Sequence, residues 1–346
     1  MKLFIKTYGC QANINDSEIL AAKYKKQGNI IMNYESEADT ILINSCSVKN
    51  KTQSKILYYI NQYYNSKKII VAGCLINTID LKKQFPKIEL LDTLSLKRLN
   101  QPLMRKDKDI AIIQISQGCM NECAYCATNL AKKSLKSYPI KEIRFELERA
   151  VKEGCKKIYL TSQDNGCYGF DFKRKQKTNL ANLLDELIGV EGNYKIRAGM
   201  ANPQYIKKFL PQLIKSFKSN KIQKFIHIPV QSGSDKVLKD MKRGHTAEDF
   251  EKIAIAFRKA FPRSKFPDST IATDIIIGYP TETEKDFNKT LELIKRVKPE
   301  VLNISAFSSR PKTSASKLKQ LSSEIIKKRM VELNNLYKSY RKDILV

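Results

Sequence analysis

In the first 100 residues, short apolar runs typical of strands alternate with segments whose apolar positions have helical spacing. Short β-branched apolar runs occur at 3–8, 39–44 and 68–72, and helical spacing follows the first two at 15–27 and 52–64. Strands that alternate with helices are typical of a parallel sheet with helices on both faces. We therefore predict a doubly wound α/β domain over residues 1–100.

The same alternation resumes near residue 109 with a longer series of units. Six apolar runs are separated by helical segments, a pattern that fits a partial (βα)6 barrel over 109–310. The predicted strands are 110–116, 157–161, 195–200, 224–230, 271–277 and 301–307. A charged stretch with one proline, 100–108, is the predicted linker.

The last segment, 311–346, is a basic tail, and its residues 323–345 have the spacing of an amphipathic helix. Its apolar stripe carries Ile326, Met330, Leu333, Tyr337, Tyr340 and Ile344, at alternating intervals of four and three. Such a stripe favours a helix that docks on the preceding domain. Its other faces are basic.

The net charge of the chain bears on its possible partners. The chain of 346 residues has 63 Lys and Arg against 35 Asp and Glu, a formal net charge of +28. Such an excess indicates a polyanionic partner or a general lysine bias. The amino terminus lacks a signal-peptide core, and no apolar run reaches the ~18 residues of a membrane span, so we predict a cytoplasmic protein that binds no membrane.

Three of the eight cysteines share one loop after the first strand of the second domain. Cys119, Cys123 and Cys126 form the spacing C-x3-C-x2-C in QGCMNECAYC. Three thiolates suit a [4Fe–4S] cluster with one open iron, whereas a closed zinc site needs a fourth ligand from a distant Cys or His. The spacing, with Tyr125 before the last cysteine, resembles the signature of radical S-adenosylmethionine enzymes.

Three further cysteines each follow a predicted strand of the first domain. Cys10, Cys46 and Cys74 end the runs FIKTYGC, ILINSC and IIVAGC. Because the carboxyl ends of parallel strands meet at one edge of a sheet, these thiols are predicted to form a second three-cysteine iron–sulfur site. The alternative is that each is a small core residue. Cys155 and Cys167 are interpreted as inert.

Several stretches together resemble the methylthiotransferase family of radical S-adenosylmethionine enzymes, from Lys2 to about Leu318. They are TYGCQANINDSE, INSCSV, VAGC, QGCMNECAYC, HIPVQSGSDKVLKDMKRG and TDIIIGYPTETEKDF. Within the family, ATNLAKKSLKSYPI, IYLTSQDNGCYGFD and RAGMANPQYI are similar to the archaeal and eukaryotic branch, the N6-threonylcarbamoyladenosine tRNA methylthiotransferases. That branch adds a methylthio group to C2 of the modified adenosine next to the anticodon.

The resemblance implies cofactors and partners. It implies two [4Fe–4S] clusters, a radical-generating one on Cys119, Cys123 and Cys126 and an auxiliary one on the other three cysteines. It also implies S-adenosyl-L-methionine, a tRNA substrate, an electron donor and a sulfur source of unidentified nature. Barrel geometry places the S-adenosylmethionine contacts at the carboxyl ends of the strands. The candidates are Tyr125, Gln163, Asp164, Arg197, Gln231, Ser232, Asp274 and Gly278.

For some of these polar positions a structural role stays open. Arg197 and Asp274 stand within apolar strands, where the alternative to a ligand contact is an internal ion pair. His227 is interpreted as a hydrogen-bonded core histidine rather than a metal ligand.

The chain departs from its relatives at three places. Lys132-Lys133 replaces a customary Arg-Gly and is predicted to face RNA phosphate, and Thr281 replaces a customary Gly. Relatives carry a C-terminal RNA-binding β-barrel, for which this sequence has no counterpart. Either it is truncated, or a separate chain supplies RNA binding, or the basic helix replaces part of it. The helix residues predicted to contact RNA are Lys327, Lys328, Arg329, Arg341 and Lys342.

Other functions remain as alternatives. Within the family these are the methylthiotransferase of a ribosomal-protein aspartate and, third, the bacterial isopentenyladenosine enzyme. Outside catalysis, the chain could be an iron–sulfur RNA-binding relative that lost activity. The presence of all six ligand cysteines opposes that last alternative, and the branch-like motifs and basic charge oppose the aspartate enzyme.

Overall fold

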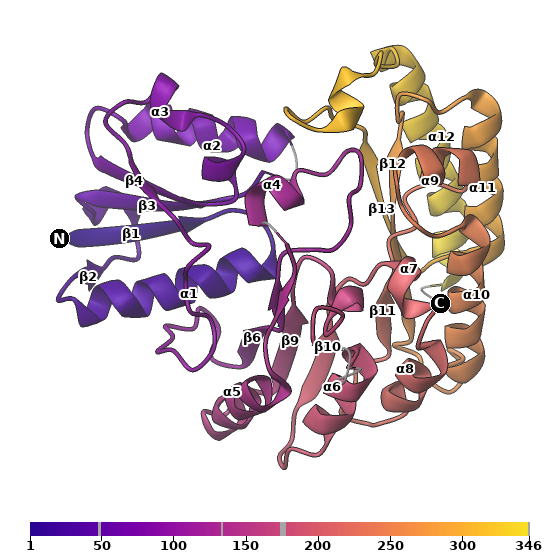
Figure 1. Cartoon of the computed structure of the whole chain (residues 1–346), viewed down its shortest axis with the longest axis horizontal. Coiled ribbons are helices and arrows are strands. Elements are labelled where there is room, and N and C mark those ends of the chain that lie inside the picture. Colours follow the sequence, from indigo (N-terminus) through magenta and orange to yellow (C-terminus); the bar gives the residue numbers. More distant parts are fainter. Residues whose placement is uncertain (48–49, 133, 174–177, 345–346) are drawn as a thin grey trace. The chain divides into compact units, whose positions relative to one another are not determined.

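The computed structural model describes residues 1–47, 50–132, 134–173 and 178–344 (Figure 1). The chain forms two compact units that interleave along the sequence. The first unit contains Met1–Cys119, Ala127–Gln163 and Val190–Tyr194, and the second contains Met120–Cys126, Asp164–Gly189 and Lys195–Val346. The predicted domains 1–100, 109–310 and 311–346 are divisions by sequence pattern, and they stay a prediction.

The first unit is built on a five-stranded sheet of order β2-β1-β3-β4-β5, in which every pairing is parallel. Its strands are β1 (Lys2–Thr7), β2 (Ile30–Ile31), β3 (Thr40–Ser45), β4 (Lys68–Gly73) and β5 (Glu89–Leu91). The register pairs Thr7 with Asn44 and Ser45 with Gly73, so β1, β3 and β4 end side by side.

Helices cover both faces of this sheet, as Figure 1 shows. Helix α1 (Gln11–Lys26) lies on one face, and α2 (Asn50–Tyr63) and α3 (Leu81–Gln84) lie on the other. Leu42 packs with Leu20 of α1, whereas its neighbours on β3 pack with Ile56 and Ile60 of α2. All of β3 is therefore buried, which explains its unbroken apolar run and confirms the doubly wound prediction.

The first unit also holds the first two strands predicted for the second domain. Strand β6 (Ile110–Gln114) pairs in parallel with β9 (Lys157–Thr161), with α5 (Ile140–Lys152) between them in sequence. A short antiparallel pair, β7 (Ser116–Gln117) and β8 (Lys136–Ser137), brackets the cysteine loop and α4 (Thr128–Lys132). The remaining short elements are η1 (Glu35–Glu37) and η2 (Leu75–Asn77).

The second unit continues the series of strands. Strands β11 (Phe225–His227), β12 (Thr270–Ile277) and β13 (Val301–Ala306) pair in parallel. Ile196 of β10 (Lys195–Ala198) makes an isolated parallel bridge to Ile222, which precedes β11. The surrounding elements are η3 (Asn165–Cys167), α6 (Leu180–Ile188), α7 (Pro203–Ile206), α8 (Leu210–Phe217), α9 (Asp235–Asp240), α10 (Ala247–Ala260), α11 (Glu284–Val297), η4 (Ser314–Lys317) and α12 (Ser323–Ile344).

Local sequence explains where several of these helices begin and end. Thr246 and Thr283 begin α10 and α11 with capping boxes closed by Asp249 and Asp286. The segment between β10 and β11 forms two helices, α7 and α8. Pro211 lies in the first turn of α8, where its missing N–H costs nothing, so the helix restarts there. In the described residues, no helix combines the length and apolarity needed to cross a membrane.

Candidate active site

Cys46 and Cys74 directly follow the adjacent parallel strands β3 and β4, and Cys10 lies three residues after the end of β1, so all three lie at one edge of the first unit's sheet. Gly9, with φ +110°, turns the chain so closely that a Cβ on it would lie 2.8 Å from Cys46 Cβ and 3.1 Å from its Sγ. Only glycine fits such a turn, so the residue before Cys10 is held against Cys46.

Two buried side chains tie these three loops together. The Asn13 amide donates to Tyr8 O at 2.8 Å and to Ser45 O at 2.9 Å, which joins the Cys10 loop to the Cys46 loop. The Ser45 hydroxyl donates to Ala72 O and accepts from Leu75 N at 3.1 Å, which joins the Cys46 loop to the Cys74 loop. These hydrogen bonds therefore fix the three loops relative to one another.

Burial raises the pKa of the Cys74 thiol to about 12, and the nearby Cys10 and Cys46 also act to raise it. A bare thiolate is therefore unfavourable at this position, whereas coordination to a cationic metal centre would stabilise it. The site offers three soft donors and a protein frame, which fits an iron–sulfur cluster with one open iron.

The second cysteine set lies in the loop that begins after β7. In the second unit, Cys126 N donates to Cys123 O at 3.0 Å, and Ala124 N donates to Met241 O at 3.0 Å. The tight turn presents two of the three thiols, and the second bond fastens it to the end of α9. The donor set of this loop, three cysteines in eight residues, again fits three-point ligation of a cluster.

Arg243 is the residue of this site that the sequence prediction missed. It is buried, its Nη1 lies 3.3 Å from Cys123 Sγ and 3.4 Å from Tyr125 Oη, and its Nη2 donates to Pro229 O at 2.9 Å. Burial opposes its charge, but Tyr125 and Cys123 more than offset this and keep its pKa above the usual value. The signal was a single arginine in KRGH, a stretch otherwise consistent with a basic surface.

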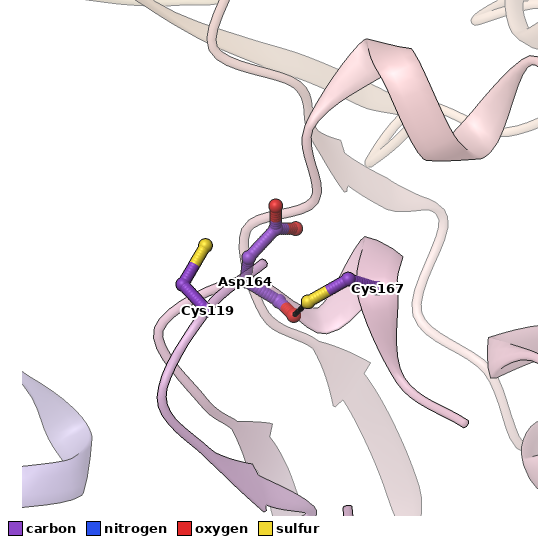
Figure 2. Close-up of side chains that lie close together, drawn as sticks. All are labelled: Cys119, Asp164 and Cys167. Atoms are coloured by element: carbon purple, nitrogen blue, oxygen red, sulfur yellow. Dashed lines mark hydrogen bonds between the residues drawn. The ribbon is translucent and has the colours of Figure 1, made fainter. Parts of the chain in front are cut away.

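Asp164 anchors the other side of the same loop. Its carboxylate accepts from Asn121 Nδ2 at 2.8 Å and from the backbone N–H groups of Gly166 and Asn202 at 2.9 Å each. The Cys167 thiol donates to the Asp164 carbonyl at 3.2 Å (Figure 2). Burial raises the pKa of Asp164, while these donors act to lower it. Cys155 and Cys167 are both buried.

The remaining candidates for S-adenosylmethionine contact fall into two groups. Arg197 stacks on Phe225 with its Cζ 3.9 Å from the ring centroid, and Asp274 lies 3.1 Å from His227 Nε2 and accepts from Asn303 at 2.7 Å. These contacts give Arg197 an aromatic partner and place Asp274 in a partly exposed polar group with His227 and Asn303.

The other group is held mainly by backbone. Gln163 accepts from Gly118 N at 2.7 Å, and Ser232 Oγ accepts from Ser234 N at 3.2 Å. Gln231 has φ +75°, and its buried Oε1 has no hydrogen-bond partner among the described residues. Gly278 has φ +79°, and a Cβ there would lie 2.5 Å from Ile326 of α12, so glycine permits close packing. Thr281 Oγ1 donates to Asp240 Oδ2 at 2.6 Å.

The structure separates the predicted RNA contacts. Lys327, Lys328 and Arg341 are exposed on α12. Arg329 is not: it is buried, with ion pairs to Glu282 at 2.8 Å and Glu284 at 3.0 Å. Arg329 lies beside the apolar stripe and faces the start of α11, so the structure favours a packing role. Lys133 and the Lys342 side chain lie outside the described residues.

Lys132 is also buried, with Nζ 3.7 Å from Asp16 Oδ2. Its ammonium faces into the first unit, so the predicted phosphate contact is not what the structure shows.

Comparison with known proteins assigns both halves of the chain. Residues 113–294 match the Radical SAM superfamily, and residues 2–92 match the Uncharacterized protein family UPF0004. In solved structures the fold is similar to the radical S-adenosylmethionine methyltransferase TsrM from Kitasatospora setae, with TM-score 0.63 and 10% identity over 91% of this chain and 75% of that one. This similarity supports the fold.

Curated relatives are much closer in sequence. A probable threonylcarbamoyladenosine tRNA methylthiotransferase of Pyrococcus horikoshii is 40% identical over 95% of this chain and 82% of its own length. The Archaeoglobus fulgidus counterpart is 37% identical over 97% and 83%. The human threonylcarbamoyladenosine tRNA methylthiotransferase is 35% identical over 98% of this chain and 63% of its own. At this identity and coverage, the chain belongs to the threonylcarbamoyladenosine tRNA methylthiotransferase family.

Proposed function

We propose that this chain is a radical S-adenosylmethionine enzyme that converts N6-threonylcarbamoyladenosine, next to the anticodon of tRNA, to its 2-methylthio derivative. The observation that carries the proposal is the presence of two separate three-cysteine sites on a family-specific sequence. One site suits generation of a radical and the other suits a sulfur carrier, and this transfer needs both.

The residues present fit the cofactors of this family. Cys119, Cys123 and Cys126 would hold one [4Fe–4S] cluster, and the three cysteines of the first unit would hold the other. When bound with S-adenosylmethionine, these groups supply a carbon radical that activates the C–H bond and a sulfur atom for transfer. A reductant and a sulfur source are needed in addition.

The chain itself contributes orientation and charge. Arg243 places a buried cation against Cys123 Sγ, and Asp164 fixes the start of the same loop through Asn121. Asn13 and Ser45 fix the spacing of the other three cysteine loops. These groups restrict the loops that carry the two ligand sets. Without them, the loops would gain conformational freedom and the thiols would lose their relative positions.

Contacts to S-adenosylmethionine are proposed on the second unit's strands. Arg197 and Asp274 offer charge for the amino-acid part, and the unpartnered Oε1 of Gln231 offers a buried acceptor. Tyr125, Gln163, Asp164, Ser232 and Gly278 remain candidates by their positions after the strands. The exposed cations of α12 are proposed to contact tRNA phosphates.

The test is nucleoside mass analysis of tRNA from a strain that lacks the gene, complemented with this chain. We expect 2-methylthio-N6-threonylcarbamoyladenosine to disappear on deletion and to return with wild type and with Cys155→Ala. It should not return with Cys46→Ala. Cys155 is a matched control because it is a buried cysteine outside both sets.

Unchanged methylthiolation of this nucleoside in the deletion strain would overturn the proposal. A mass change in a ribosomal protein in its place would assign the chain to the aspartate-modifying branch.

A further inference from the structure

A buried group of charged residues with excess positive charge lies in the first unit. Asp16, fully buried, is bound by Arg98 with Nε–Oδ1 2.8 Å, and Lys132 lies 3.7 Å away on the other oxygen. The side chains of Arg98 and Lys132 are 1% and 4% exposed. Two cations therefore share one carboxylate, which leaves a net positive charge inside the protein.

Neutral partners complete this group without cancelling its charge. Gln114 Nε2 donates to Asp16 Oδ1 at 2.7 Å, and Arg98 donates to Thr93 O at 2.7 Å and to Leu96 O at 3.1 Å. A buried cation is costly unless an anion compensates it. Arg98 donates two hydrogen bonds to the Asp16 carboxylate, whereas the Lys132 ammonium lies 3.7 Å from it. The charge of Lys132 is therefore the less well compensated of the two.

Lys132 ends a helix that packs beside one of the cysteines. The Asn77 amide donates to Ala131 O at 3.2 Å and so ties α4 to η2. The helical turn η2 begins directly after Cys74, which is its N-cap residue. Helix α4 therefore packs against the turn that follows Cys74, and the buried Lys132 is the last residue of that helix.

We propose that Lys132 is the buried counter-cation of the metal centre held by Cys10, Cys46 and Cys74. Three thiolates make such a centre anionic, and each electron added makes it more so. A fixed ammonium in a low-dielectric interior therefore stabilises the reduced form. The inference rests on the proposed function only because it needs a cluster at these three cysteines. It gives Lys132 an electrostatic role at that cluster in place of the predicted contact with RNA phosphate.

The experiment isolates this cluster in the full chain by replacing Cys119, Cys123 and Cys126 with Ala. After anaerobic reconstitution, the reduced fraction is followed by electron paramagnetic resonance at set potentials, for Lys132→Met, Lys132→Arg and Lys136→Met. At a fixed potential, we expect Lys132→Met to lower the ratio of reduced to oxidised cluster by about tenfold, equivalent to about 59 mV for one electron.

Two variants control for charge and for packing. Lys132→Arg keeps the cation and should stay within about twofold of the parent ratio. Lys136→Met removes an exposed lysine four residues away and should leave the ratio unchanged. Loss of iron in Lys132→Met with full loading in Lys132→Arg would also support the proposal, since the two differ in charge.

An unchanged ratio in a fully loaded Lys132→Met protein would overturn this inference and leave the proposed function standing. A parent that binds no iron would instead remove the auxiliary cluster and contradict both. Weaker tRNA binding by Lys132→Met, with a flatter salt dependence and an unchanged redox ratio, would return Lys132 to phosphate contact.

Discussion

At the scale of single residues, Arg243 is the side chain on which most of the second unit's cysteine loop depends. Its guanidinium reaches Cys123, Tyr125 and Pro229 at once, a geometry that a point charge on lysine does not reproduce. We expect Arg243→Gln to lower the free energy of unfolding by about 2 kcal/mol and to impair iron loading of this loop, whereas Lys239→Gln, exposed on α9, should do neither. Urea unfolding and an iron count measure both; normal loading in Arg243→Gln would contradict this role.

His245, two residues further on, provides a pH-dependent prediction. Burial and the neighbouring Arg243 lower its pKa from 6.5 to about 3. Between these values the unfolded state binds the proton and the folded state does not, so stability falls as the pH drops below 6.5. From pH 7.5 to 5.5 this group alone should cost about 1.4 kcal/mol. Urea unfolding at both values should show a correspondingly smaller loss in His245→Gln, and an equal loss would argue against a buried neutral imidazole.

At the scale of elements, the sequence located the strands well because each buried strand is an apolar run of β-branched residues. It also predicted that Cys10, Cys46 and Cys74 lie at the same edge of the sheet, because the carboxyl ends of parallel strands meet there. It could not show that Arg329 and Lys132 are buried. A basic residue on a helix has the same letter whether it faces solvent or a buried carboxylate, and only packing against Glu282 or Asp16 distinguishes the two.

The amino-terminal end of α1 is the element that joins two cysteine loops, through the amide of Asn13. Asn13→Ala leaves Tyr8 O and Ser45 O without this donor, so we expect iron to fall from roughly eight to roughly four atoms per chain. Asn29→Ala is the matched control. Asn29 follows the carboxyl-terminal end of α1, and its amide donates to Tyr24 O in the last turns of that helix. Iron analysis after anaerobic reconstitution gives the answer, and full loading of Asn13→Ala would show that the strand ends alone position the thiols.

At the scale of the whole molecule, the +28 charge is general, but its density is highest near the carboxyl end, where ten basic residues oppose three acidic ones over 310–346. Among the described side chains, the exposed cations of α12 are Lys327, Lys328, Lys338 and Arg341. If they contact tRNA, each phosphate contact contributes about 0.7 to 0.9 to the slope of log affinity against log salt.

Replacing these four exposed cations with Gln should therefore flatten the slope by about 3 and weaken binding at low salt. The control removes the same charge from the first unit at Lys25, Lys26, Lys51 and Lys55, all exposed. Arg329→Gln should lower stability without changing the slope, because its guanidinium is bound to Glu282. Filter binding of threonylcarbamoylated tRNA across a salt series distinguishes these outcomes. Equal slopes for the two four-residue variants would mean that α12 acts only through net charge.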